Sequence, residues 1–270
     1  MKRISRPFRN KVVIVTEASA GIGRELALQL ATQGARLALA GQNGERLDEV
    51  AGECAKRGAP VLVVPSDVTD EGQSRALVER TVAEFGRLDM LINNAGTSMW
   101  PRFEQLPDLT PLERMMRVNY FGSVYCTHAA LPHLRRSRGR LVAVSSLTGK
   151  TGAPTGTGYA ATEYAMVGFF DSLRIQLAGS GVSVTVVYPG FVTPEFEEPT
   201  LSGDGRPPAR GNSPVNEGDM MTAEERARQI LKAAAARRRE LVMTRQARVG
   251  MWFKLVRPGL MDRIALSCSE

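Results

Sequence analysis

The feature that most constrains the fold of this chain is a regular alternation of short apolar runs with longer helical stretches. Runs of this length and composition are typical of strands that are buried on both faces of a parallel sheet. They lie at 12–16, 36–40, 61–64, 88–92, 140–144, 183–188 and 240–243. The pattern predicts an α/β fold with an open, mostly parallel, seven-stranded sheet in the doubly wound order 3-2-1-4-5-6-7, with helices on both faces.

The loop after the first run has the composition of a nucleotide-binding turn. Residues 17–23 join that run to a helix predicted from Arg24 to Gln33, and Gly21 and Gly23 lie within the loop. Glycine lets the backbone approach a pyrophosphate, and the N-terminus of the helix attracts the negative charge. The order of strand, glycine-bearing loop and helix therefore predicts a dinucleotide site.

A second group of chemically capable residues spans 144–163. Ser146 follows the run 140–144, a glycine-rich turn comes next, and Tyr159 and Glu163 share one helix face because they are four residues apart. A hydroxyl at a strand end facing a phenol suits proton transfer, with Ser146 polarising a carbonyl oxygen that Tyr159 protonates. The alternative from spacing alone is a helix N-cap region with a half-buried tyrosine.

This second group resembles the catalytic block of the short-chain dehydrogenase/reductase family, in which a Ser and a Tyr are followed by a Lys four residues after the Tyr. The segment Val-Ser-Ser-Leu-Thr-Gly-Lys at 144–150 is most similar to the 11β-hydroxysteroid dehydrogenase-like branch of the family. The resemblance implies a Rossmann-type fold and an NAD(P)-dependent oxidoreductase that interconverts a secondary alcohol and a ketone by hydride transfer. The chain departs from the family at Glu163, which replaces the Lys, and at Glu17, which replaces a Gly.

The resemblance also assigns roles to residues outside this block. Asn119 matches the residue that holds a water in a proton relay, although an Asn inside an apolar helix also suits a structural role with a buried partner. The implied catalytic residues are Asn119, Ser146, Tyr159 and Glu163. The implied cofactor-binding residues are Thr16, Glu17, Ser19, Gly21, Ile22, Gly23, Gln42, Asp67, Val68, Asn94, Ala95, Gly96, Tyr159, Pro189, Gly190, Val192 and Thr193.

The residues after the second run bear on the choice of cofactor. An acidic residue here binds the adenosine ribose and favours NAD, whereas a basic one favours the 2′-phosphate of NADP. The chain reads Gly41-Gln42-Asn43, without an acid. On that ground the sequence favours NADP(H) over NAD(H), with a protein that binds neither tightly as the alternative.

The two acidic departures decide how the mechanism is interpreted. A Lys about 5 Å from a phenolate stabilises it by roughly 3 kcal/mol at an effective dielectric of ~20, and an ionised Glu163 reverses the sign. Glu17 strains the backbone if its turn needs φ > 0, and its carboxylate repels a pyrophosphate unless the side chain swings into solvent. Three accounts follow: a weakened oxidoreductase, which we adopt; an impaired fold acting as a binding or scaffold protein; and non-redox chemistry in the same pocket.

Composition limits the remaining classes of function. No apolar run approaches the ~20 residues of a membrane span. The odd number of cysteines suits a reducing cytoplasm, and the expected partner is a small-molecule alcohol or ketone. Three cysteines and two histidines show no metal-ligand spacing, so no metal is expected. The net charge of +7 is concentrated toward the C-terminus without a recognised nucleic-acid motif, so no nucleic-acid partner is expected.

Domain organisation is predicted to be simple. We expect one domain over 1–270, with a Pro- and Gly-rich loop at 194–219 acting as a substrate lid. The tail at 245–270 mixes large apolar with basic residues, which suits a membrane surface or packing over the substrate pocket or a subunit contact, and we favour packing. The resemblance further implies a homodimer or homotetramer.

Overall fold

A computed structural model describes residues 6–189, 200–201 and 221–267 of the chain. Its strands are β1 (Val12–Thr16), β2 (Arg36–Gly41), β3 (Val61–Pro65), β4 (Met90–Asn93), β5 (Ser98–Met99), β6 (Arg140–Val144), β7 (Ser183–Tyr188), β8 (Thr200–Leu201) and β9 (Glu240–Val242). Its helices are α1 (Gly21–Thr32), α2 (Gly44–Lys56), α3 (Glu71–Phe85), α4 (Thr110–Met115), α5 (Gly122–Ser137), α6 (Thr157–Gln176), α7 (Ala223–Ala235), α8 (Arg245–Val256) and α9 (Pro258–Ser267).

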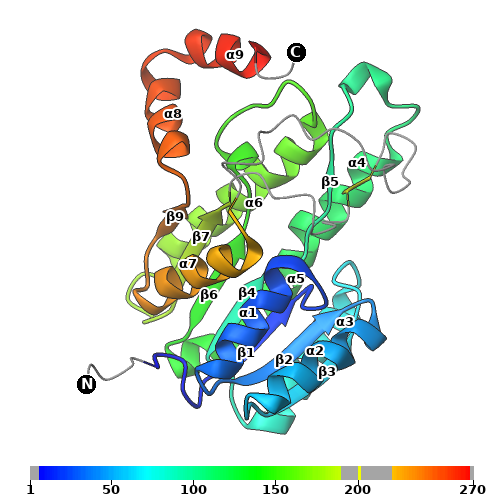
Figure 1. Cartoon of the computed structure of the whole chain (residues 1–270), viewed down its shortest axis with the longest axis vertical. Helices are drawn as coiled ribbons and strands as arrows, with labels where there is room; N and C mark the ends of the chain where they lie inside the picture. The colour runs from blue at the N-terminus through cyan, green and yellow to red at the C-terminus, as the bar shows by residue number, and fades with distance from the viewer. Residues whose placement is uncertain (1–5, 190–199, 202–220, 268–270) are drawn as a thin grey trace.

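The central sheet has seven strands in the order β3-β2-β1-β4-β6-β7-β9, and every pairing in it is parallel (Figure 1). Counted along the chain, these are the seven predicted strands in the predicted order. The short strands β5 and β8 were not predicted and pair with each other outside the sheet. The predicted α/β doubly wound fold is confirmed.

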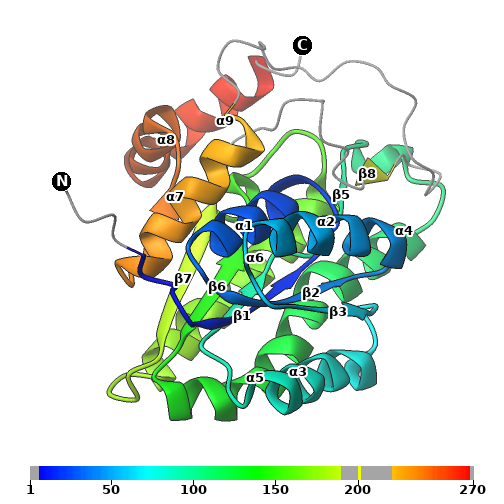
Figure 2. The same ribbon diagram turned by 60° about the horizontal axis from the view of Figure 1, so that its bottom comes forward.

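Each face of the sheet is covered by helices, which explains why the strands are apolar throughout. Val13 and Val15 of β1 pack into one core cluster with α1, α2 and α7, whereas Val12 and Ile14 pack into a second cluster with α3, α5 and α6. Figure 2 shows α1, α2 and α7 on one side of the sheet and α3 and α5 on the other. Since neither face meets water, the two-residue alternation of polar and apolar side chains is lost.

Helix boundaries follow local signals in the sequence. Asp70 caps α3 by accepting a hydrogen bond from the backbone N–H of Gln73 at 2.9 Å, and Gly86 ends that helix in the left-handed region with φ 76°. Thr222 caps α7 by accepting from the N–H of Glu225 at 3.2 Å. The predicted spans of β1, β6 and β7 match the structure, and the helix that the pattern over 71–85 predicts is α3.

The pattern over 110–133 predicts a long helix that is interrupted near residues 118–120, and the structure confirms the interruption. A π-helical segment, η2 (Met116–Phe121), separates α4 from α5 and contains Asn119. At the start of α5, a Cβ on Gly122 would lie 2.7 Å from a methyl carbon of Val68, so a larger residue would push the helix off the loop after β3. The π-helical segment η2 places the amide side chain of Asn119 among buried residues.

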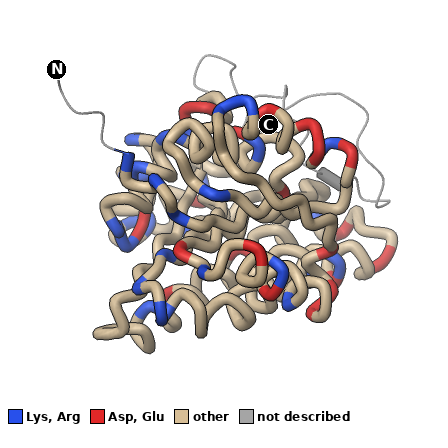
Figure 3. The backbone as a smooth tube through the Cα atoms, turned by 90° about the horizontal axis from the view of Figure 1, so that it is seen from below, with Lys and Arg blue, Asp and Glu red and all other residues tan. Residues whose placement is uncertain are grey.

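Charged positions are spread unevenly over the backbone. Seen from below, Lys and Arg predominate on the side where the N-terminus emerges, and Asp and Glu are more frequent on the opposite side (Figure 3). Within the described ranges, no helix has the length and apolar character needed to cross a bilayer, and no group of His, Cys, Asp and Glu side chains suits a metal ion. The predicted ligands Gly190, Val192 and Thr193, and the predicted lid at 194–219 apart from β8, lie outside the described residues.

Candidate active site

The candidate site lies at the carboxyl edge of the sheet. In a parallel sheet every strand ends at the same edge, so the loops after β1, β4 and β6 come together there. These loops carry most of the residues that the sequence singled out, and Pro189 follows β7 at the same edge, buried. The parallel topology therefore gathers positions that are up to 173 residues apart in the chain.

The loop after β1 has the predicted shape. Glu17 and Gly21 both have positive φ, at 53° and 52°, so the turn does require the left-handed region that a non-glycine residue adopts only with strain. A Cβ on Gly23 would lie 2.0 Å from the carbonyl oxygen of Glu17, so only glycine fits there. The N-cap of α1, Ala20, has no side-chain hydrogen bond to the first turn, and this turn contains no acidic residue. The helix N-terminus is therefore suited to an anion.

The Glu17 side chain does not extend freely into solvent, which corrects the simplest interpretation of its sequence position. It is partly buried, and Ser19 Oγ donates a hydrogen bond to its Oε1 at 3.3 Å. Burial raises the pKa of Glu17, the Ser19 hydrogen bond partly offsets this, and the nearby charge of Asp67 raises the pKa further. The carboxyl group is thus held next to the loop, where its protonation state matters for any bound anion.

Thr16 and Asn94 fasten the loop after β1 to the loop after β4. Thr16 Oγ1 accepts hydrogen bonds from the backbone N–H groups of Asn94 and Ala95, at 2.9 and 3.0 Å. Asn94 Nδ2 donates to the carbonyls of Thr16 and Glu17, at 3.2 and 3.4 Å. Thr16 is buried, so these two predicted ligands shape the site mainly by joining its loops.

The remaining predicted ligands lie at strand ends beside this loop pair. Gln42 is exposed directly after β2, and Asp67 accepts hydrogen bonds from both the N–H and the hydroxyl of Thr69 at 2.8 Å. Val68 is buried, as is Ile22 on the first turn of α1. Gly96 lies close to the side chain of Asn119, since a Cβ there would be 3.7 Å from Asn119 Oδ1.

The loop after β6 packs directly on α6. Ser146 is the N-cap of a short 3-10 turn, η3 (Leu147–Gly149), and its Oγ accepts from the N–H of Thr148 at 3.3 Å. A Cβ on Gly149 would lie 3.0 Å from Ser145 Oγ and 3.1 Å from the carbonyl oxygen of Glu163. A side chain here would push its neighbours by a few tenths of an ångström, so the turn that Ser146 opens lies close against the helix that carries Tyr159.

Tyr159 lies in the first turn of α6, as predicted. Its ring contacts the Trp100 ring edge to face, with centroids 5.4 Å apart. Its carbonyl oxygen accepts a hydrogen bond from Thr162 Oγ1 at 2.8 Å. The segment between β5 and the 3-10 turn η1 (Phe103–Gln105), through Trp100, therefore forms one wall beside the phenol.

Asn119 is buried, with 1% of its surface exposed, and its amide joins three elements. Its Oδ1 accepts from the N–H of Thr97 at 2.8 Å, and its Nδ2 donates to the Thr97 carbonyl and to Thr162 Oγ1, both at 2.9 Å. Through Thr162 it is linked to the carbonyl of Tyr159. These bonds show the structural role that the sequence left open, whereas the predicted water relay stays a prediction.

Glu163 is almost completely buried, with 4% exposed, beside two hydrogen-bond donors. Ser145 Oγ donates to its Oε2 at 2.7 Å, and Asn119 Nδ2 lies 3.5 Å from its Oε1. A buried carboxyl group needs such donors because loss of water costs several kcal/mol for a charged group and less for a neutral one. The acidic residue is therefore built into the packing of α6 rather than accommodated at its surface.

Comparisons with known proteins identify the family. A family model described as short chain dehydrogenase matches residues 11–204. The chain belongs to the short-chain dehydrogenase/reductase family.

It is 41% identical over 203 residues to 11-beta-hydroxysteroid dehydrogenase 1A of Arabidopsis thaliana, covering 74% of this chain but only 58% of that protein. It is 33% identical over 261 residues to Dehydrogenase/reductase SDR family protein 7-like of Dictyostelium discoideum, covering 94% and 80%. The predicted family and branch are confirmed.

Solved structures give the same result for the fold. An alcohol dehydrogenase from Thermococcus sibiricus complexed with 5-hydroxy-NADP matches with a TM-score of 0.75 at 27% identity, covering 87% of this chain and 96% of that one. A short-chain dehydrogenase/reductase from Burkholderia phymatum in complex with NAD matches with a TM-score of 0.82 at 22% identity, covering 94% and 96%. The second likeness concerns the fold alone.

Lys150 is the basic residue within 144–163, but it does not take the place of the family's Lys. Its Nζ forms an ion pair with Glu240 at 3.2 Å and lies 4.7 Å from the centre of the Tyr188 ring. It is therefore engaged at the end of β7 and the start of β9. The departure from the family at Glu163 is not compensated by this ammonium group.

Three residues of the site's hydrogen-bond network were not singled out from the sequence. Ser145, Thr97 and Thr162 contact Glu163 or Asn119 through side-chain or backbone groups. Ser145 directly precedes the predicted Ser146, and Thr162 directly precedes Glu163, so the only available signal was adjacency to predicted residues. Small hydroxyl residues are too common for this to single them out.

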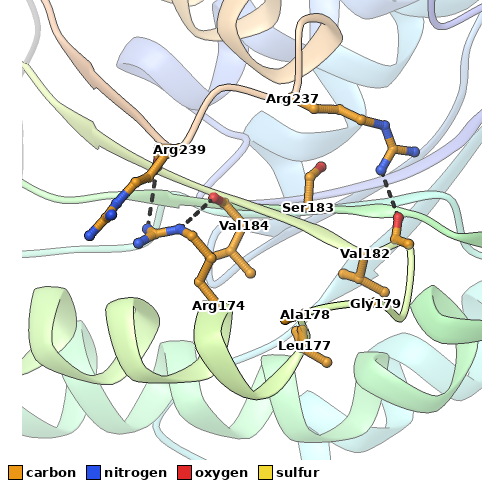
Figure 4. A pocket seen from close by; sticks show the side chains of 10 residues that line it. Arg174, Leu177, Ala178, Gly179, Val182, Ser183, Val184, Arg237 and Arg239 are labelled. Carbon is orange, nitrogen blue, oxygen red and sulfur yellow. Dashed lines mark hydrogen bonds between the residues drawn. The ribbon is translucent and has the colours of Figure 1, made fainter.

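A hollow of about 510 Å³ lies at the opposite end of the sheet, where β7 begins and α6 ends. Arg174, Arg237 and Arg239 line it (Figure 4). The Arg174 guanidinium is paired with Asp171 and with the Val184 carbonyl, and that of Arg237 donates to the Gly181 carbonyl at 2.7 Å. These arginines hold loops together through their hydrogen bonds, so we take the carboxyl edge of the sheet, rather than this hollow, as the candidate functional site.

Proposed function

We propose that the chain is an NAD(P)-dependent oxidoreductase that interconverts a secondary alcohol and a ketone, with an activity lowered by Glu17 and Glu163. The observation that supports this most directly is the close approach at Gly149. It brings the turn opened by Ser146 against the helix whose first turn carries Tyr159. A hydroxyl and a phenol on neighbouring elements are the groups that a carbonyl reduction needs.

The loop after β1 fits a dinucleotide in shape. The close approach at Gly23, the positive φ at Gly21 and the uncapped N-terminus of α1 leave a backbone cradle suited to a pyrophosphate. When bound, the nicotinamide supplies or accepts the hydride. The exposed Gln42 at the end of β2, with no acid beside it, favours NADP(H), because a carboxylate there would repel the 2′-phosphate.

Side chains of the protein would polarise the substrate, transfer the proton and position the catalytic helix. Ser146 Oγ polarises the carbonyl oxygen of the substrate, and Tyr159 gives it a proton or removes one from the alcohol. Asn119 keeps the first turn of α6 in position through Thr162. An ionised Glu163 opposes formation of a phenolate at Tyr159, so the phenol gives up its proton less readily, and we propose that this lowers the activity.

The names of the relatives suggest where to look for a substrate. Because the relatives are named hydroxysteroid dehydrogenases, we propose a bulky, apolar ketone or alcohol. The test measures oxidation of NADPH with a panel of cyclic and polycyclic ketones, using the full chain and a Tyr159→Phe variant. We expect slow turnover that the variant loses.

The same experiment separates the alternatives. Tight NADPH binding without turnover on any ketone, for the native chain and for Glu163→Lys alike, contradicts the redox proposal and supports a binding protein. Absence of NADPH binding up to millimolar concentration contradicts the cofactor assignment. The cytoplasmic location and the homo-oligomeric state stay predictions.

A further inference from the structure

The C-terminal helices α8 and α9, called here the tail helices, expose an unusual amount of apolar surface. Trp252 is 60% exposed and Leu255 is 84% exposed, although side chains of this kind are normally buried. Further exposed apolar residues of the tail helices are Val249, Phe253, Val256, Leu260 and Leu266. Figure 1 shows the tail helices beside the main body, beyond β9. Exposed apolar residues concentrated in this way mark an interaction surface.

One side of α8 is already packed on the body of the protein. Ala247 and Met251 are partly buried against the core cluster that contains α6, and Lys254 Nζ donates to the Lys150 carbonyl at 2.7 Å. These positions follow helical spacing and lie on one face. Trp252 and Leu255 belong to the rest of the circumference, so the contact with the body leaves an apolar face of α8 uncovered by the described residues.

The two tail helices also hold each other. A Cβ on Gly250 would lie 3.4 Å from the terminal methyl carbon of Met261, so α8 and α9 approach closely at this glycine. The exposed residues of both helices are therefore parts of one connected surface. This surface is formed by the tail helices and shares no residue with the candidate active site.

Charge decides between the partners that such a surface fits. The stretch 245–266 contains five basic residues and one acidic residue, Asp262, which gives a formal charge of +4. In a twofold contact between two copies, the same patch would face itself and the like charges would repel. An anionic bilayer complements the patch, since each Lys or Arg near it adds about fivefold in affinity, and Trp favours the interface between headgroups and acyl chains.

We propose that the tail helices dock the protein on an anionic lipid surface, with Trp252 and Leu255 inserted at the boundary between headgroups and acyl chains. The basic residues Arg245, Arg257 and Arg263 face the lipid phosphates. The protein then lies on the bilayer rather than in it, held by the exposed apolar and basic residues of the tail helices. This docking goes beyond the proposed oxidoreductase function and does not require turnover.

The test is co-sedimentation of the full chain with vesicles of two compositions, phosphatidylcholine alone and phosphatidylcholine mixed with phosphatidylglycerol. We expect binding to the mixed vesicles that weakens as salt is added, and little binding to the neutral ones. Trp252→Ser should weaken binding by about tenfold, because a large apolar side chain no longer enters the interface. Ile175→Ser is the matched control, since Ile175 is 76% exposed on α6, which is not one of the tail helices, and should leave binding unchanged.

Two results would overturn the proposal. One is a failure of the anionic vesicles to report the tail: either the native chain does not bind them, or it binds them no better than Trp252→Ser does. Thermal unfolding must show that both proteins are folded. The other is a dimer, measured by light scattering, that Trp252→Ser converts to a monomer while no vesicle binding is seen. The second result assigns the surface to another copy of the chain.

Discussion

Glu17 and Glu163 are the same chemical departure from the family, yet the structure places them in opposite environments. Glu17 lies in a loop, its backbone is in the left-handed region, and its side chain is only partly buried against Ser19. Glu163 lies within a helix, its backbone is unstrained, and its buried side chain accepts a hydrogen bond from Ser145. The first departure therefore strains and charges a binding loop, whereas the second alters the chemistry of a packed interior.

The comparison leads to separate expectations for binding and for catalysis. A carboxylate beside a pyrophosphate cradle weakens binding of the cofactor. A carboxyl group one helical turn from Tyr159 changes the energy of proton transfer. Substitutions at the two positions should therefore change different measured quantities.

The largest expected effect is at Glu163. We expect Glu163→Lys to raise the kcat for ketone reduction by about 10- to 100-fold, because a cation ~5 Å from the phenolic oxygen stabilises its ionised form. Glu163→Gln removes the charge without adding a cation, so it serves as the control and should raise kcat only a few-fold. A folded Glu163→Lys protein with no gain in rate would show that this position does not limit catalysis.

The next effect is on cofactor binding at Glu17. Glu17→Gly should tighten the Kd for NADPH by about tenfold, since a charge repulsion of this kind at ~6 Å is reduced by the partial exposure of the side chain. It should also stabilise the fold by about 1 kcal/mol, because glycine adopts the left-handed conformation without strain.

Glu17→Gln separates these two contributions. It removes the charge and keeps the backbone strain, so it should tighten NADPH binding without stabilising the fold. Fluorescence titration and thermal unfolding of the three proteins check the prediction. Equal NADPH affinity in all of them would mean that the cradle binds the pyrophosphate beyond the reach of Glu17.

The hydroxyl partners of the two glutamates allow a stability test. Ser145→Ala should lower the free energy of unfolding by about 1–2 kcal/mol, because it removes a hydrogen bond that Ser145 donates to a buried carboxyl group. Ser19→Ala removes the corresponding donor from the partly exposed Glu17 and should cost less than about 0.5 kcal/mol. Denaturant unfolding of both variants measures the difference, and a larger loss for Ser19→Ala would reverse our ranking of the two sites.

The smallest expected effect is a dependence of cofactor binding on pH. Burial raises the pKa of Glu17 above its ordinary value of 4.5, so the carboxyl group becomes neutral at a higher pH than a solvated glutamate. Because the folded chain holds this proton more tightly, the contribution to stability is full below the unfolded pKa and is lost as pH rises through the folded pKa. Affinity for NADP⁺ should follow the same sign and increase a few-fold as pH falls through this raised pKa.

Calorimetric titration with NADP⁺ at a series of pH values measures this dependence. Glu17→Gln is the control, because titration of the ligand's own phosphate is common to both proteins and cancels in the comparison. A pH profile that is identical for the two proteins would exclude Glu17 as the titrating group.

Much of the fold was predictable from the sequence because its signals are local. The spans of β1 and β6 follow from short apolar runs, and those of α3 from Asp70 at its start and Gly86 at its end. The extra strands β5 and β8 were missed since two-residue strands leave no periodicity to detect. The tail helices were also missed as helices, because their apolar residues surround α8 rather than forming the single stripe that indicates an amphipathic helix.

The sequence by itself determined which chemical groups are present at the candidate site and which two of them are acidic where the family has Gly and Lys. These follow from spacing within short segments, such as the four residues between Tyr159 and Glu163. Only the tertiary structure decided that Asn119 bonds to Thr97, that Ser145 bonds to Glu163 and that Glu17 is held by Ser19. The first two contacts each join a loop residue to a helical residue, 22 and 18 positions apart in the chain. The physical reason is that burial and hydrogen-bond partners depend on how strands and helices pack together, and this packing is absent from the local pattern.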